Sequence, residues 1–178
     1  IVAVKQFRLD WTPEQAHALA GALQTLIETL PAHPSIVPPL AAGLEGATVW
    51  LAQELVAADG LDARMRRRTA VGAEALVAVA RQIALALDVG ADAGWRHGAL
   101  HPRDVLVDTT GRVRVTGIGI AQLVERFGAK PPRRRPYGAP ERAPGQPWDA
   151  RADVFALAVI AAEWLAPRRS RPGTEPLA

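Results

Sequence analysis

The patterning of apolar residues changes near residues 56–60, and this change constrains the fold more than any other feature of the sequence. Before it, IVAVKQF (residues 1–7) has the alternating character of a strand, and two further strand-like runs, SIVPPLAAG and ATVWLAQELV, are joined by the turn GLEG. Pro38 and Pro39 mark the first of these two runs as an edge strand or as irregular. After Asp59-Gly60 the pattern becomes helical. The sequence therefore predicts a small antiparallel sheet followed by a mainly helical part.

Three long helices are predicted, in addition to a short one at LDARMRRR (61–68) that directly follows Asp59-Gly60. The first begins at Thr12, which can cap it, has Pro13 in its first turn and ends before Pro31. The second covers residues 71–89. The third, residues 149–165, is apolar on most sides and is expected to be buried.

The second helix is the longest apolar segment of the chain, but it is not a membrane span. Glu74, Arg81 and Asp88 interrupt it, and a span of this length would rarely tolerate three charges. The first residues lack the pattern of a signal peptide. We therefore expect a core helix and no membrane insertion.

Beyond residue 100 the sequence predicts a short hairpin and a long connection. The runs VLVD (105–108) and RVRVT (112–116) read as two strands joined by a glycine turn. Residues 117–140 form a connection rich in Gly, Pro and Arg. A connection of this length more often has a function or is mobile than serves only to join two elements. The polar tail, residues 167–178, is expected to be disordered.

The composition excludes several classes of function. The chain has no cysteine, so it can form no disulfide, thiol nucleophile or cysteine-ligated metal site, and a reducing cytoplasm fits. Its formal net charge of +3 is too small to imply nucleic acid. The arginine runs at 64–68, 133–135 and 168–171 are most simply solvated faces, with a site for an anionic partner as the alternative.

Five motifs and their order resemble the protein kinase fold, specifically that of bacterial Ser/Thr kinases. VAVK (2–5) resembles the strand whose lysine holds nucleotide phosphates, and HPSIV (33–37) the turn after the regulatory helix. HGALHPRDVLV (97–107) resembles the catalytic loop, TGIGIA (116–121) the metal-binding triplet with its flanks, and YGAPE (137–141) the end of the activation segment. In addition, ARADVFALAVIAAEWL (150–165) resembles the central helix of the large lobe.

The resemblance implies an α+β fold with the two lobes of a protein kinase. Residues 1–58 would form a partial N-lobe with a small antiparallel sheet and without the glycine-rich loop, because the chain begins after the place where that loop would lie. Residues 59–166 would form a partial, mainly helical C-lobe that stops after its central helix. Residues 167–178 would be a basic tail.

The resemblance also assigns the positions that carry phosphoryl transfer. The family's catalytic aspartate, phosphate-neutralising lysine and metal-binding asparagine fall on Ala99, His101 and Asp104, and the aspartate of the metal triplet falls on Gly117. A methyl group cannot accept a proton, and glycine offers no ligand. The sequence therefore predicts a degenerate kinase, a pseudokinase, that is not an enzyme and has no metal site. The spacing of His97 and His101 could suit zinc on a helix, but Gly98 and Pro102 argue against a helix there.

The residues that support the catalytic loop match the family better than the residues that would carry out the reaction. The resemblance gives structural roles to His97 beneath the metal triplet, to Ile118 in place of the aromatic residue that would stack on it, and to Asp153 as acceptor for the catalytic-loop backbone. Glu141 matches a glutamate that pairs with an arginine of the large lobe. Arg142, Arg151 or residues outside the chain are the expected partners.

Four further residues form a tentative nucleotide pocket by resemblance: Lys5, Gln53, Glu54 and Leu55. The glutamate that should pair with Lys5 falls on Leu23 or Gln24, so Lys5 alternatively snorkels from the sheet edge. A pocket that binds adenine can remain after the metal ligands are lost, so no cofactor is expected except ATP bound without metal.

Three functions stay open. The first is a cytoplasmic scaffold or regulatory module that binds an acidic or phosphorylated protein through Arg133, Arg134 and Arg135, alone or as the cytoplasmic part of a larger protein. The second is a weakly active or atypical Ser/Thr kinase in which Asp104 or Asp108 takes the role of the catalytic aspartate, which Ala99 cannot fill. The third is a nucleotide sensor without phosphotransfer.

Overall fold

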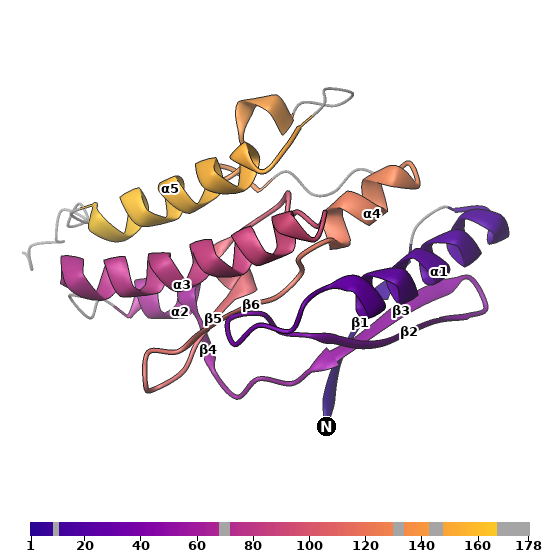
Figure 1. Cartoon of the computed structure of the whole chain (residues 1–178), viewed down its shortest axis with the longest axis horizontal. Coiled ribbons are helices and arrows are strands. Elements are labelled where there is room, and N and C mark those ends of the chain that lie inside the picture. The colour runs from indigo at the N-terminus through magenta and orange to yellow at the C-terminus, as the bar shows by residue number, and fades with distance from the viewer. Residues whose placement is uncertain (9–10, 68–71, 130–133, 143–147, 167–178) are drawn as a thin grey trace, which may run out of the picture.

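The first sheet of the protein carries Lys5 toward the interior. The computed structural model describes residues 1–8, 11–67, 72–129, 134–142 and 148–166. Strands β1 (Val2–Phe7), β2 (Pro39–Glu45) and β3 (Thr48–Glu54) form an antiparallel sheet in the order β1-β3-β2 (Figure 1). Lys5 lies opposite Leu51 in this register. The strand predicted from residue 35 begins at Pro39 instead, and β2 is an edge strand with an irregularity after this proline, which has no N–H to donate.

Helix α1 (Pro13–Thr29) covers one face of this sheet (Figure 1). Its first turn has the predicted cap: the Gln15 N–H donates to Oγ1 of Thr12, and the Thr12 N–H donates to the side chain of Gln15. The reciprocal pair forms a capping box, which satisfies two of the N–H groups that a helix start leaves free. Leu19, Leu23 and Leu26 of α1 are fully buried against Val49 and Leu51.

A second sheet supports the loop that resembles a catalytic loop. Strands β4 (Asp59–Gly60), β5 (Val105–Val107) and β6 (Val113–Val115) pair in the order β4-β5-β6. Helix α2 (Leu61–Arg66) follows β4, and the long helix α3 (Ala73–Asp92) packs against β6. A short 3-10 turn, η1 (Pro102–Asp104), leads directly into β5. The position of Asp104 is therefore fixed by a buried strand on one side and a proline turn on the other.

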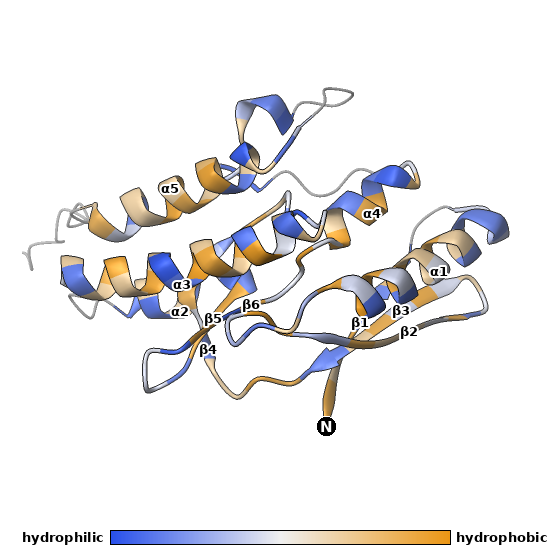
Figure 2. Cartoon of the chain, viewed as in Figure 1, coloured by the Kyte–Doolittle hydropathy of each residue, from blue (hydrophilic) through white to orange (hydrophobic). Residues whose placement is uncertain are grey.

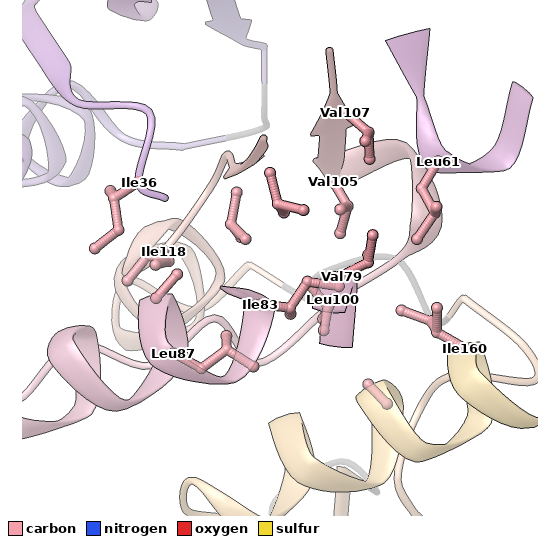
Figure 3. Packing of buried hydrophobic residues seen from close by; sticks show 14 of the residues in the cluster. Ile36, Leu61, Val79, Ile83, Leu87, Leu100, Val105, Val107, Ile118 and Ile160 are labelled. Atoms are coloured by element: carbon pink, nitrogen blue, oxygen red, sulfur yellow. The ribbon is translucent and has the colours of Figure 1, made fainter. Parts of the chain in front are cut away.

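The core beneath this second sheet joins β5, β6, α2, α3 and α5 (Figure 3). Val105, Val107, Leu61 and Leu100 are almost completely excluded from solvent. Ile36 links this core to the segment before β2, because it forms a bridge with Val115.

The long connection predicted at 117–140 contains a helix that the sequence pattern did not indicate. Helix α4 (Ile120–Arg126) follows Gly119, which has a positive φ of 81°, and buries Ala121, Leu123 and Val124. Three buried residues in a seven-residue helix give too short a repeat for periodicity to detect. A second 3-10 turn, η2 (Pro140–Arg142), lies further along the connection.

Helix α5 (Arg151–Leu165) runs beside α3 (Figure 1) and is less buried than the sequence predicts. Apolar residues recur along its whole length (Figure 2). Ala152, Asp153, Ala156 and Ile160 are buried, but Val154 is 64% exposed and Leu165 is 57% exposed. The apolar composition of this helix predicts burial on most of its sides. In the described part of the chain, however, only one face of α5 packs against α3.

The α+β fold class is confirmed, with one small antiparallel sheet under a helix followed by a mainly helical part. The division at residues 58 and 59 stays a prediction. The tail predicted to be disordered, 167–178, lies outside the described residues.

Candidate functional site

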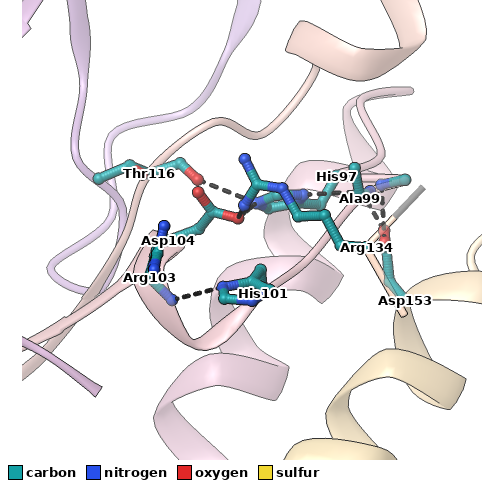
Figure 4. A network of polar contacts seen from close by, with 9 residues as sticks. His97, Ala99, His101, Arg103, Asp104, Thr116, Arg134 and Asp153 are labelled. Carbon is teal, nitrogen blue, oxygen red and sulfur yellow. Dashed lines mark hydrogen bonds and ion pairs between the residues drawn. The ribbon is translucent and has the colours of Figure 1, made fainter. Parts of the chain in front are cut away.

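Asp153 fixes the backbone of the loop at residues 97–99. It lies in the first turn of α5, only 4% exposed, and its two carboxylate oxygens accept hydrogen bonds from the backbone N–H groups of His97 (2.8 Å) and Gly98 (2.7 Å) (Figure 4). A buried carboxylate is costly unless strong donors meet it, and here two do. This is the contact that the resemblance implied for Asp153.

The ring of His97 bridges this loop to the end of β6. Nε2 lies 2.9 Å from the carbonyl oxygen of Thr116, and Nδ1 accepts the backbone N–H of Ala99 at 3.4 Å. Because a carbonyl cannot donate, Nε2 carries the proton and donates to Thr116. The side chain of Ala99 takes no part, so position 99 contributes only backbone to the site.

Gly117 lies between the ring of His97 and the amine of Lys5. Its φ is 92°, and a Cβ built on it would lie 3.5 Å from Nε2 of His97 and 3.8 Å from Nζ of Lys5. The amine of Lys5 therefore reaches from the first sheet to the end of the second, and does not snorkel from the sheet edge. Burial lowers the pKa of Lys5, the charge of Asp104 raises it and that of Arg134 lowers it.

Asp104 is paired with an arginine from a distant part of the chain. Nη1 of Arg134 donates to Oδ2 of Asp104 at 2.7 Å, and the same oxygen lies 4.0 Å from Nε2 of His97 (Figure 4). The Asp104 side chain is 14% exposed, against 35% for Arg134. We call the set formed by Lys5, His97, Asp104, Gly117 and Arg134 the Asp104 site.

Tyr137 holds the segment that supplies Arg134. The carbonyl oxygen of Arg134 accepts the N–H groups of Tyr137 and Gly138, which closes a turn. The Tyr137 hydroxyl donates to the carboxylate of Glu163 on α5, and its ring meets the ring of His101 edge-on at 4.8 Å. Burial raises the pKa of Tyr137, and so does the bond to Glu163. Arg134 is therefore fixed from α5 as well as from η1.

His101 caps η1, the turn that carries Asp104. Its Nδ1 accepts the N–H of Arg103 at 3.0 Å. Burial lowers the pKa of His101, and the positive charge of Arg134 lowers it further.

Ile118 and Glu141, the other predicted structural residues, are not members of the Asp104 site. Ile118 is 3% exposed and packs on Gly90 of α3, where a Cβ would approach it to 2.8 Å. Glu141 has neither nominated arginine as an ion-pair partner among the described residues. Arg142 pairs with Glu125 of α4 at 2.6 Å, and Arg151 pairs with Asp149 at 3.0 Å.

Lys5 lies on β1, and the other three residues of the predicted nucleotide pocket lie at or just after the end of β3. Gln53 is buried at the end of β3, and Leu55 is 52% exposed. Glu54 is committed elsewhere, because Arg114 on β6 donates to both of its oxygens, at 2.5 and 2.8 Å. The regulatory-helix positions do not face Lys5 with an acid: Leu23 is buried under the sheet, and Gln24 donates to the carbonyl oxygen of Ala42.

The side chains at the Asp104 site do not fit the magnesium that the fold family implies. Mg²⁺ takes oxygen ligands in octahedral geometry, and in nucleotide sites one or two free carboxylates hold it together with phosphates and waters. Here one carboxylate, Asp104, is already bonded to Arg134, and Gly117 has no side chain. No cluster of three or more His, Cys, Asp or Glu side chains that could hold a metal occurs among the described residues.

The basic run at 133–135 is split by the structure. Arg133 lies outside the described residues. Arg134 is engaged with Asp104, and Arg135 is exposed. The sequence does not predict that Arg134 enters the site, because it lies thirty positions after Asp104 and no local pattern joins the two. The available signal was a basic residue in the segment that follows the metal-triplet motif.

A search for helices long and apolar enough to cross a membrane found none in the part of the chain that the structure describes.

Comparison with known proteins gives a consistent picture. The family model described as "Protein tyrosine and serine/threonine kinase" matches residues 1–173. Serine/threonine-protein kinase PknA of Mycobacterium tuberculosis is 29% identical over 72% of this chain and 31% of its own length. Serine/threonine-protein kinase PkaB of Streptomyces coelicolor is 31% identical over 75% of this chain and 35% of its own length. The chain thus spans about a third of these relatives.

The names of these relatives point to an enzyme, so the prediction that the chain is not an enzyme is wrong. That prediction weighed the short side chains at Ala99 and Gly117. It gave too little weight to the charged groups that stay in the site, Lys5 and Asp104, and to the hydrogen-bonded frame around them.

Proposed function

The chain belongs to the protein tyrosine and serine/threonine kinase family, and from this membership we propose that it works as a protein-binding regulatory module of the serine/threonine kinase type. One observation carries the proposal. The segment that follows the metal-triplet motif is tied to the Asp104 site by Arg134, and to α5 by Tyr137. A partner that binds this segment would act directly on the charge of the site.

The partner we propose is an acidic or phosphorylated protein segment that contacts Arg135. This arginine is exposed beside the engaged Arg134, and guanidinium groups pair strongly with carboxylates and phosphates. The alternative basic surface on α2 is less suitable, because its arginines are already used within the chain. Arg66 pairs with Asp62, Arg67 with Asp59, and Arg64 donates to the carbonyl oxygen of Asp108.

Peptide binding tests this proposal. A phosphoserine peptide titrated into the protein and followed by fluorescence anisotropy should bind, and Arg135→Ala should weaken binding about tenfold, the loss of one charge-assisted pair. Arg81→Ala is the matched control, since Arg81 is an exposed arginine on α3. Equal weakening by both variants, or no binding by the wild type, would refute the proposal.

A second candidate function is phosphoryl transfer of an atypical kind that depends on Asp104. The observation in its favour is that Oδ2 of Asp104 lies 4.0 Å from Nε2 of His97, and that the charge of Asp104 raises the pKa of Lys5. A carboxylate can orient a substrate hydroxyl when it is within hydrogen-bond reach. Transfer of labelled phosphate from ATP to a protein substrate measures it, and activity that Asp104→Ala leaves unchanged would exclude this role.

We also propose a cytoplasmic location, which the complete absence of cysteine supports.

A further inference from the structure

We infer that Arg134 takes the place of a divalent cation in the Asp104 site, so that the site binds the phosphate groups of a nucleoside polyphosphate without metal. The inference does not depend on the protein-binding role proposed above. It starts from the disagreement between the side chains present and the ligand needs of Mg²⁺: one carboxylate is present, and a guanidinium already occupies it.

The charges around Asp104 favour an anion. Two basic side chains lie at this carboxylate: Arg134 donates to Oδ2 of Asp104 at 2.7 Å, and Nζ of Lys5 lies 3.8 Å from a Cβ built on Gly117. Burial lowers the pKa of Lys5, whereas the charge of Asp104 raises it. His97 presents a proton to Thr116 and adds no negative group. Two cations and one carboxylate leave the site with one net positive charge. A polyphosphate would meet these cations where a metal-dependent site needs Mg²⁺ to neutralise it.

Arg134 has donors left for such a ligand. A guanidinium offers five N–H groups, and among the described residues the Arg134 side chain has a hydrogen bond only to Asp104, through Nη1. Its backbone is fixed in a turn by Tyr137 and Gly138, so the side chain is aimed before any ligand arrives. A pre-organised guanidinium loses less freedom when it binds phosphate than a mobile one.

Gly117 is consistent with this use of the site. A Cβ there would stand 3.8 Å from Nζ of Lys5, so glycine leaves position 117 without a side chain beside the amine. No carboxylate at this position competes with phosphate for the amine.

Titration calorimetry with and without metal tests the inference. ATP should bind the wild type with the same dissociation constant, within about twofold, in EDTA and in excess Mg²⁺. Arg134→Ala should weaken binding in EDTA by about tenfold or more, the effect expected from losing a hydrogen bond to a charged group. It should also make binding respond to Mg²⁺, because Asp104 loses its guanidinium partner. Arg81→Ala, which removes an exposed arginine on α3 outside the Asp104 site, is the matched control and should bind ATP as the wild type does.

Two further arms identify what is recognised. Inorganic tripolyphosphate should compete with ATP, whereas adenosine should compete weakly, because the inferred contacts are made to phosphate. Thermal unfolding of each variant shows whether it is folded, and Arg134→Lys, which keeps the charge, should retain part of the metal-free affinity. Binding that requires Mg²⁺, metal-free binding untouched by Arg134→Ala, stronger competition by adenosine than by tripolyphosphate, or no binding at millimolar ATP would each overturn the inference.

Discussion

At the scale of single residues, the carboxylate of Asp153 determines the shape of the loop that carries His97. It is buried, and each of its oxygens accepts one backbone N–H. Changing Asp153→Asn replaces one acceptor by a donor that faces an N–H group. We expect unfolding free energy to fall by about 2–4 kcal/mol, the range for breaking a buried charged hydrogen-bond pair.

Urea denaturation measures this loss, and Asp149→Ala serves as control. Asp149 precedes the same helix, but its side chain is 47% exposed and pairs with the exposed Arg151. Its removal should cost less than about 1 kcal/mol. A similar cost for both variants would show that the backbone contacts of Asp153 do not hold the loop.

Lys5 gives a prediction on pH. Burial lowers the pKa of its amine below the ordinary value of 10.5, so the unfolded chain binds this proton more tightly than the folded one. The charged amine therefore costs stability below its folded pKa, and the cost disappears as pH rises toward 10.5. We expect Lys5→Met to raise the melting temperature at pH 7, and the gain to shrink as the pH approaches 10.

Melting curves of both proteins between pH 7 and pH 10 measure this gain. A gain that is constant across the range would mean that the amine does not titrate differently in the folded state. A loss of stability at pH 7 would mean that its attraction to Asp104 outweighs burial.

At the scale of elements, Gly119 sets how closely α4 approaches α1. Its φ is 81°, and an added Cβ would lie 2.7 Å from Cδ1 of Leu26. Gly119→Ala therefore combines a left-handed backbone with overpacking, and we expect it to cost about 2–4 kcal/mol. Gly111→Ala has a similar φ of 84° with nothing within 4 Å of its Cβ, and should cost only about 1–2 kcal/mol.

The difference between these two glycine variants, measured by urea denaturation, isolates packing from backbone strain. Equal losses would show that the contact between α4 and α1 has no energetic consequence.

The elements with strong local signals were predictable from the sequence, and the others were not. The cap at Thr12 and the length of α3 were both visible in the residue pattern, because capping and periodicity are local properties. Helix α4 was not visible, since its start depends on a positive φ at Gly119 and on burial against α1.

The Asp104 site divides in the same way. Asp153 was predicted to accept bonds from the loop on the strength of a motif, and the structure has these bonds. The partners of Asp104 and Tyr137 were not predictable, because Arg134 and Glu163 reach them only after the chain has folded. Long-range polar pairs of this kind leave no periodic trace in the sequence.

At the scale of the whole molecule, Arg114 joins the two sheets. From β6 its guanidinium donates to both oxygens of Glu54 at the end of β3, and to the carbonyl oxygen of Ile36. These bonds tie the sheet that carries Lys5 to the second sheet, whose strand β5 directly follows Asp104. The distance between the two charged groups of the site therefore depends on this clamp as well as on the packing of Ile36 against Val115.

Removing the clamp should loosen the molecule in a pH-dependent way. The hydrogen bond from Arg114 lowers the pKa of Glu54 below its ordinary value of 4.5, so the clamp contributes stability above pH 4.5 that is lost as the pH falls through the lowered folded pKa. At pH 7, Arg114→Ala should reduce unfolding free energy by about 1 kcal/mol, because the Glu54 side chain is 42% exposed and solvent screens the pair. Glu54→Gln should lose less unfolding free energy than Arg114→Ala, and the difference between its stability and that of the wild type should narrow as the pH falls below 4.5.

The control is Arg112→Ala, which removes an exposed arginine beside the same strand and should change stability by less than about 0.5 kcal/mol. Urea denaturation at pH 7 and pH 3.5 checks each value, and a Glu54→Gln difference that stays the same at both pH values would show that the two sheets are held together without this ion pair.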